Sequence, residues 1–220
     1  MNAIEAFHNP RCRQAISPLM LAALLALPAG CATPPPADVP APAPEVTNAA
    51  EPLPAPAARV EIPPQAQADF AEGVRLLTAG EYDKGIALLK STAGETKDFP
   101  APLINLGMAY ARTGELKQAE TYFMQALELD PDNPVAGNEY AILKRKTGRF
   151  GEARQLYEKM LKEYPRYYLA RRNLGVLCDL YLRDLECAIK QYQAYSKAFP
   201  DNREVQKWIA DLKQRMEQQE

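Results

Sequence analysis

Apolar and small residues recur at one fixed spacing along most of the chain after residue 65. Gly73, Gly107, Ala141 and Gly175 are each thirty-four residues apart. Two further series share this spacing: Gly80, Gly114 and Gly148, and Gly85, Ala119 and Ala153. A period of this length predicts a solenoid, in which each repeat is a small helical unit that buries its apolar face against its neighbours.

The second repeat, residues 100–133, shows the pattern most completely. Its apolar, small and turn positions are Leu103, Leu106, Gly107, Tyr110, Gly114, Ala119, Phe123, Ala126 and Pro131. Small residues such as Gly107 allow the two helices of one hairpin to approach closely, and Phe123 fills the layer between hairpins. Gly114 supplies the turn after the first helix, and Pro131 cannot continue the second.

This pattern resembles the tetratricopeptide repeat. The resemblance implies an all-α fold, a right-handed superhelix of about four helix-turn-helix repeats with a C-terminal capping helix. The repeats are expected within residues 65–202, at 66–99, 100–133, 134–167 and 168–202, and the capping helix at 203–220. The first repeat lacks a terminal proline at Lys97, and the second helix of the fourth arrives one residue late. The capping helix would cover the apolar edge of the fourth repeat.

Residues 1–31 have the organisation of a bacterial export signal. Arginines precede an apolar run of about ten residues, which is too short to span a bilayer. The small residues before Cys31 resemble the lipoprotein box, in which the cysteine is acylated, although Pro28 stands where that box has an aliphatic residue. Ala32 resembles an outer-membrane sorting signal. We expect an outer-membrane lipoprotein that faces the periplasm; the alternative is ordinary signal cleavage and a soluble periplasmic protein.

Residues 32–64 are rich in proline and alanine. More than half of the 20 prolines of the chain come before residue 65. Proline fixes φ and removes an N–H donor, so this composition predicts a disordered linker of loose polyproline II conformation. We interpret the segment as a spacer; the alternative is a proline-rich ligand for an aromatic groove.

Two cysteines, Cys178 and Cys187, flank the expected turn of the fourth repeat at about equal distances. Leu182 occupies the place of the turn glycine there, and one extra residue follows it. Because an antiparallel hairpin places the two cysteines opposite each other, we predict a disulfide that staples this irregular hairpin in an oxidising periplasm. The alternative is a pair of buried free thiols.

In tetratricopeptide arrays the first helices line a concave groove, and the resemblance implies a set of partner-binding positions here. They are Phe70, Val74, Ile104, Asn105, Met108, Arg112, Asn138, Ile142, Arg145, Arg172 and Val176. This groove would be apolar at its N-terminal end and basic toward its middle, which suits an extended or helical segment with an acidic end from another envelope protein. The alternative is that Arg145, Lys146 and Arg172 are solvated surface charges.

The composition narrows the possible functions. The only histidine, His8, lies in the expected signal, so the mature chain has none for nucleophilic catalysis or for binding a metal. A net charge of −2 gives no electrostatic case for nucleic acid, and we expect membrane contact only through the lipid anchor. We therefore expect no enzyme activity, cofactor or metal, but a protein-protein interaction scaffold that assists assembly of a multiprotein envelope complex. The alternatives are a self-associating structural protein and an accessory subunit of an envelope enzyme or transport system.

Overall fold

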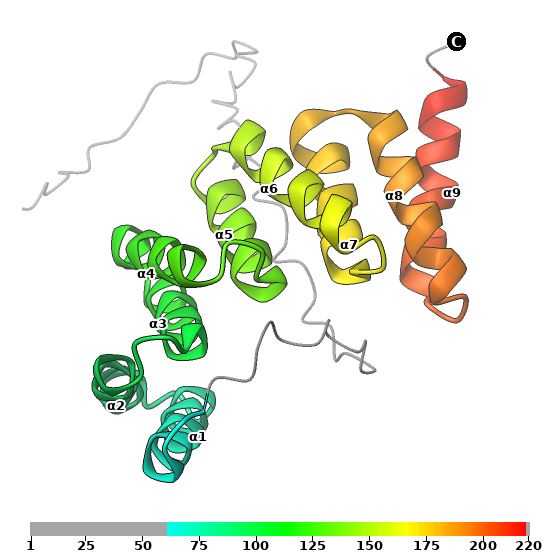
Figure 1. Cartoon of the computed structure of the whole chain (residues 1–220). Helices are drawn as coiled ribbons and strands as arrows, with labels where there is room; N and C mark the ends of the chain where they lie inside the picture. The colour runs from blue at the N-terminus through cyan, green and yellow to red at the C-terminus, as the bar shows by residue number, and fades with distance from the viewer. Residues whose placement is uncertain (1–60, 219–220) are drawn as a thin grey trace, which may run out of the picture. The chain divides into compact units, whose positions relative to one another are not determined.

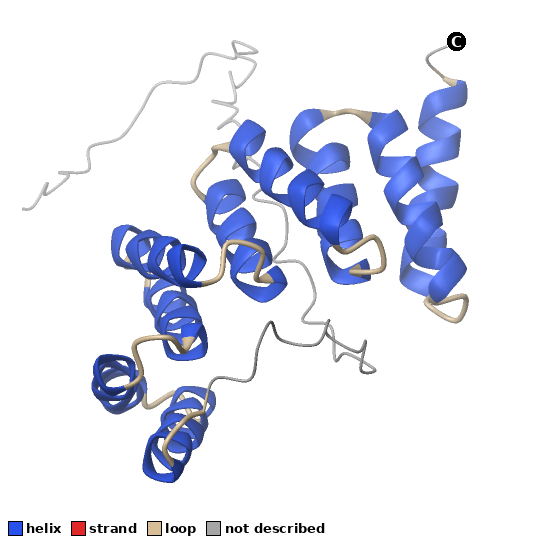
Figure 2. Ribbon diagram, in the orientation of Figure 1, coloured by secondary structure: helices blue, strands red, loops and turns tan. Residues whose placement is uncertain are grey.

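The computed structural model describes residues 61–218, and every regular element in that range is a helix (Figure 1, Figure 2). The expected export signal, its Cys31 and the linker up to residue 60 lie outside the described residues. The helices are α1 (Pro64–Thr78), α2 (Tyr82–Glu95), α3 (Pro100–Thr113), α4 (Leu116–Leu129), α5 (Pro134–Lys146), α6 (Phe150–Glu163), α7 (Tyr168–Val176), the π-helical turn η1 (Leu177–Leu182), α8 (Leu185–Ala198) and α9 (Arg203–Glu217).

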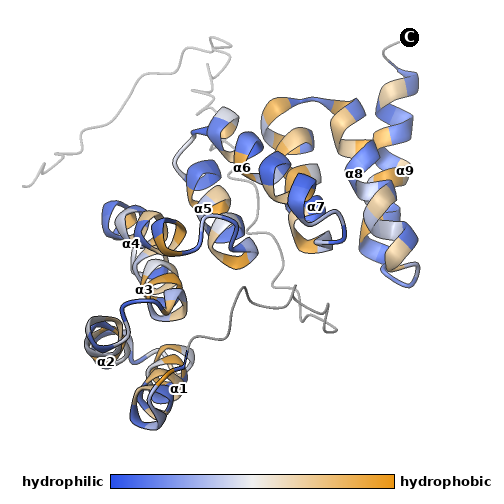
Figure 3. Ribbon diagram, in the orientation of Figure 1, coloured by the Kyte–Doolittle hydropathy of each residue, from blue (hydrophilic) through white to orange (hydrophobic). Residues whose placement is uncertain are grey.

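Consecutive helices pack side by side, so α1 to α8 form four hairpins that stack in chain order (Figure 1). Apolar and polar residues alternate around each helix, as the hydropathy colouring shows (Figure 3). Because each helix buries only one stripe, no hairpin can bury its apolar surface alone. Among the described helices none combines the length and the apolar character needed to cross a membrane.

The first three hairpins turn at the glycines of the thirty-four-residue series. Gly80, Gly114 and Gly148 have φ values of 80°, 89° and 77°, in the left-handed region that a side chain disfavours. The N–H that follows each glycine donates to the carbonyl five residues earlier, at 2.9, 2.9 and 2.8 Å. These are the hydrogen bonds of a glycine-terminated helix, and they explain why a glycine recurs at this position.

Close approach within each hairpin explains a second glycine series. A Cβ added to Gly107 would lie 2.6 Å from a ring carbon of Phe123, and one added to Gly175 would lie 2.4 Å from a ring carbon of Tyr192. These rings belong to one repeated core position, at which Leu89, Phe123, Tyr157 and Tyr192 are 0, 1, 0 and 2% exposed. The large side chain of the second helix thus fills the space that glycine or alanine leaves on the first.

An ionic cluster joins the second and third hairpins. Glu120 on α4 accepts hydrogen bonds from Arg149 at 2.8 and 2.6 Å, from Lys144 at 2.9 Å and from Tyr140 at 2.9 Å. The buried Lys144 also donates to Glu152, at 2.6 Å. The Arg149 guanidinium, with help from Lys144 and Tyr140, lowers the pKa of Glu120 from 4.5 to about 2. The buried ammonium of Lys144 needs these carboxylate partners, because loss of a partner would leave a buried charge without compensation.

The fourth hairpin departs from the other three. Its first helix ends in the π-helical turn η1, and the left-handed residue is Arg183, with φ of 54°, one place after Leu182. The closing hydrogen bond, from Asp184 N–H to Cys178 O at 2.8 Å, spans six residues instead of five. A π-turn accommodates one extra residue within a helix, so η1 absorbs the insertion that delays α8 by one position.

Helix α9 packs on the last hairpin. Val205 and Leu212 of α9 are 0% exposed, and the Trp208 ring lies 5.2 Å from that of Tyr192. Arg215 near its end donates to Asp179 of η1 at 2.6 Å. Asn202 caps the helix by accepting from Val205 N–H at 3.1 Å. The apolar edge of the fourth hairpin is therefore covered, as a solenoid end requires.

Candidate protein-binding groove

The inner face of the array is formed by the first helices of the hairpins. Helix α3 contacts both α1 and α5, so these helices follow one another along one face. The predicted groove residues are distributed over α1, α3, α5 and α7. Their exposure decides which of them a partner can reach.

Seven of the eleven predicted residues keep exposed surface. Arg112 is exposed, and the partly exposed ones are Phe70, Val74, Asn105, Met108, Ile142 and Arg145. The other four are buried: Ile104, Asn138, Arg172 and Val176. Their side chains pack between helices, so a partner in the groove could not contact them directly.

Arg172 differs most from the expectation, because it is only 4% exposed. Its guanidinium carbon lies 5.8 Å from the ring centre of Trp208 on α9, and its Nε has no hydrogen-bond partner among the described residues. A guanidinium over an indole face is a cation–π contact. Arg172 thus contacts Trp208 of α9 and is not accessible to a partner.

A polar chain runs between α5 and α7 beneath the groove. Asn173 donates to Asn138 Oδ1 at 2.9 Å, and Asn138 donates in turn to Glu139 Oε1 at 3.1 Å. Burial raises the pKa of Glu139, against the opposing effects of the Asn138 hydrogen bond and the Arg112 charge. Glu139 is absent from the predicted groove residues. It stands thirty-four residues after Asn105, which is in that set, so the repeat spacing could have identified it.

Two cations, Arg112 and Lys146, lie where α3 ends beside α5, and a third, Arg145, lies on α5 against η1. Lys146 is exposed and donates to the Ala111 carbonyl at 2.9 Å, next to Arg112. Arg145 is partly exposed, with its guanidinium carbon 5.6 Å from the ring centre of Tyr181. Met108 and Ile142 lie one helical turn before Arg112 and Lys146 on their helices. The middle of the inner face therefore combines positive charge with apolar surface.

The two cysteines of the fourth hairpin are joined in the structure. The Sγ atoms of Cys178 and Cys187 lie 2.01 Å apart in a disulfide. The carboxylate of Asp184 lies within 4.8 Å of both sulfurs, but it accepts from Cys187 N–H at 2.9 Å and pairs with Arg154 at 2.9 Å. Disulfide sulfurs are not thiolates, so this group does not suit a metal ion. The disulfide joins η1 to α8 across the turn of the fourth hairpin.

Stacked helical hairpins with an inner face built from alternate helices define a helical-repeat solenoid. Comparison with known families specifies the type of repeat. Two stretches, residues 100–133 and 141–180, match tetratricopeptide repeats. The chain therefore carries tetratricopeptide repeats, and its fold is a superhelix of that kind. The first match has the bounds expected for the second repeat.

Solved structures show the same fold. MamA from Desulfovibrio magneticus RS-1 is 23% identical with a TM-score of 0.61, over 71% of this chain and 88% of that one. A tetratricopeptide repeat protein from Parabacteroides merdae is 17% identical with a TM-score of 0.59, over 68% of this chain and 58% of that one. These identities establish the architecture alone.

Curated relatives are matched over short stretches. Anaphase-promoting complex subunit 6 of Dictyostelium discoideum is 30% identical over 83 residues, which are 38% of this chain and 10% of the relative. The human cell division cycle protein 16 homolog is 26% identical over 94 residues, 43% of this chain and 15% of the relative. The chain thus spans a small part of these proteins. Tetratricopeptide repeats are generally non-catalytic scaffolds for protein-protein interaction, and that is the function class the fold supports.

Proposed function

We propose that this chain is a non-catalytic scaffold, held in the bacterial envelope by an acylated Cys31, which binds a segment of another envelope protein along α3 and α5. The observation that carries the proposal is that Arg112 and Lys146 lie at the adjacent ends of α3 and α5, one turn after Met108 and Ile142, with Arg145 on the same stretch of α5. A surface of this kind complements an amphipathic segment with an acidic end.

The role in assembly is supported by the class of protein and by its relatives. Anaphase-promoting complex subunit 6 is by its name a component of a multiprotein complex. The export pattern of residues 1–31 and the linker of residues 32–64 support a tethered position in the envelope. A proline-rich spacer of this length extends about 3.1 Å per residue and would carry the repeats well away from a membrane.

Site-specific photo-crosslinking in native envelopes tests the groove. A crosslinking amino acid at position 108 or 142 is expected to capture the same partner, whereas position 125 on the exposed side of α4 should not. Reversing two cations, Arg112→Glu with Arg145→Glu, should abolish the crosslink, because the acidic end loses its counter-charges. The matched control is Lys117→Glu with Lys162→Glu, which makes the same charge change on exposed positions of α4 and α6. Equal loss in both double variants would refute the groove.

The anchor is tested independently of the groove. Cells fed radiolabelled palmitate should label the wild-type chain and leave a Cys31→Ser variant unlabelled. Label that persists in the Cys31→Ser variant would refute acylation of Cys31. It would leave the groove proposal standing, because the groove is tested by separate variants.

A further inference from the structure

A pocket lies on the side of the array formed by the second helices. Its volume is about 170 Å³, and it opens between α4, α6 and the turn that joins α4 to α5. Leu127, Leu156, Met160 and Tyr164 give it an apolar lining, and Gly137 forms part of its floor. None of the eleven predicted groove residues lines it. It is therefore a separate surface feature.

The α5 side of the pocket is lined by Gly137, a repeat position at which the neighbouring repeats carry larger residues. Gly137 stands thirty-four residues after Leu103 and thirty-four before Arg171. At the next hairpin junction Arg171 occupies this position and donates to the Pro165 carbonyl at 2.7 and 3.0 Å. At Gly137 no side chain is present, and a Cβ there would lie 2.7 Å from the Met160 sulfur. The Met160 side chain therefore packs directly against Gly137, and the two residues line the pocket together.

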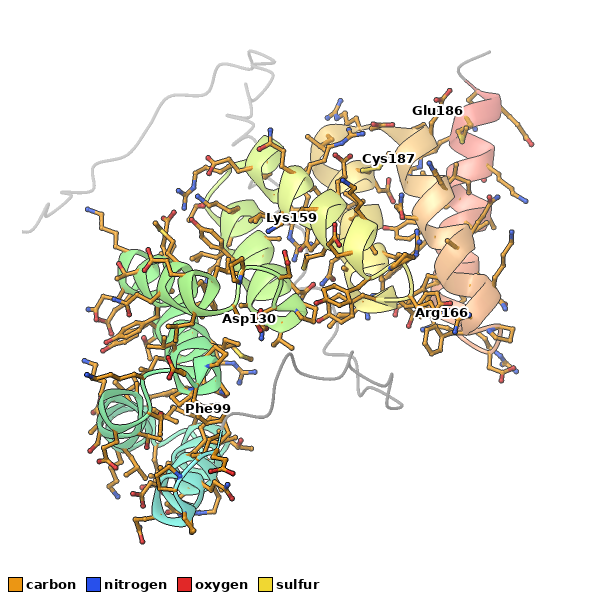
Figure 4. The ribbon with its side chains drawn as sticks, viewed as in Figure 1. Phe99, Asp130, Lys159, Arg166, Glu186 and Cys187 are labelled. Carbon is orange, nitrogen blue, oxygen red and sulfur yellow. A yellow bond between two sulfur atoms is a disulfide. The ribbon has the colours of Figure 1, made fainter. Side chains whose placement is uncertain are left out.

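The rim of the pocket is acidic. Asp132 and Glu163 line it, and Asp130 lies close enough to Tyr164 that these three carboxylates help burial to raise the pKa of its hydroxyl. The one cation on the rim, Lys159, is already engaged, because it donates to the Pro131 carbonyl at 2.9 Å and pairs with Asp132 at 3.1 Å. Figure 4 labels Asp130 in the turn and Lys159 on α6. Three carboxylates against one ammonium leave the rim negative.

The size and polarity together specify an occupant. An apolar cavity of about 150 Å³ is large enough for benzene, so this pocket has room for one leucine-, methionine- or phenylalanine-sized side chain. A negative rim favours positive charge next to that side chain. We infer that the pocket between α4 and α6 is a second docking site, which takes one apolar side chain flanked by lysine or arginine from a partner polypeptide. Its preference is opposite in sign to that of the basic inner face.

Methyl NMR of the full chain with ¹³C-labelled methionine tests this inference. Met160 lines the pocket, whereas Met108 lies on the inner face and serves as an internal reference. The probes are three capped tripeptides: Lys-Phe-Lys, Lys-Ala-Lys and Glu-Phe-Glu. We expect Lys-Phe-Lys to shift the Met160 methyl signal in a saturable way and to leave Met108 in place, with weaker or no shifts from the other two.

Two double variants distinguish an effect of the rim charges on binding from a general effect of removing charge. Asp132→Asn with Glu163→Gln removes two exposed charges and should weaken Lys-Phe-Lys binding about three-fold or more, since each rim charge pair contributes modestly. Asp83→Asn with Glu204→Gln makes the same charge change far from the pocket, on α2 and α9, and should leave binding unchanged. The inference is overturned if Met160 does not respond to Lys-Phe-Lys, if Glu-Phe-Glu shifts it equally, or if both double variants weaken binding alike.

Discussion

The substitution Gly107→Ala tests the close packing on which the repeat is built. The added methyl group would lie 2.6 and 2.7 Å from two ring carbons of Phe123, about 1 Å inside ordinary carbon–carbon contact. The ring is 1% exposed and lies 6.3 Å from that of Tyr140, so it cannot retreat into solvent. Overpacking of this kind costs about 1–3 kcal/mol, and the better helix propensity of alanine offsets up to about 1 kcal/mol. With the full offset, we expect a net loss of up to about 2 kcal/mol.

The chain contains a matched control for this substitution. Gly151 lies in α6 with no atom near the position of an added Cβ, and its φ is not positive. Gly151→Ala should therefore stabilise the chain by up to about 1 kcal/mol, through helix propensity alone. The same chemical change is thus predicted to have opposite signs at the two sites.

Urea unfolding followed by far-UV circular dichroism measures both effects. Trp208 is the only tryptophan and reports separately on α9, so its fluorescence shows whether the array unfolds as one unit. A Phe123→Leu substitution should cost less in the Gly107→Ala background than in the wild type, because a smaller side chain relieves the clash. The packing argument is refuted if Gly107→Ala is as stable as Gly151→Ala, or if Phe123→Leu costs the same in both backgrounds.

Three further outcomes are expected. Unreduced, denatured protein should show no reactive thiol at Cys178 or Cys187, and the double serine variant should lose about 2–3 kcal/mol because a short loop is no longer closed; two reactive thiols would contradict the disulfide. Glu120 has a lowered pKa of about 2, so its contribution to stability is present above pH 4.5 and is lost as pH falls toward 2. Glu120→Gln should remove on the order of 2 kcal/mol at pH 7, after allowance for partial exposure, and parallel stability–pH curves for variant and wild type would exclude this. Deletion of residues 203–220 should raise the oligomer size in light scattering, because the apolar edge under α9 is uncovered; a monomer of unchanged stability would argue against that role.

The repeats could be predicted from the sequence because the residues that they require are set by local backbone geometry and packing. A turn glycine and a glycine at the point of close approach recur whatever surrounds them, so Gly114 and Gly107 could be interpreted from spacing alone. Exposure at the inner face was less predictable, since it depends on what packs above each residue. Nothing in the pattern around Arg172 indicates that Trp208 of α9 lies over its guanidinium. The pocket between α4 and α6 was missed for the same reason, because it depends on how Met160 packs against Gly137.

The irregular fourth hairpin determines where the accessible groove ends. The inserted residue is absorbed by η1, which places Asp179 within 2.6 Å of Arg215 on α9 and puts Cys178 opposite Cys187. These contacts hold α9 against the last hairpin, and Trp208 of α9 lies against the buried guanidinium of Arg172. The surface that remains open for a partner is then the stretch from α1 to α5, with its cations at the end of α3 and α5. The inserted residue in the fourth repeat thus supplies, through Asp179 of η1, a contact that holds the C-terminal helix in place.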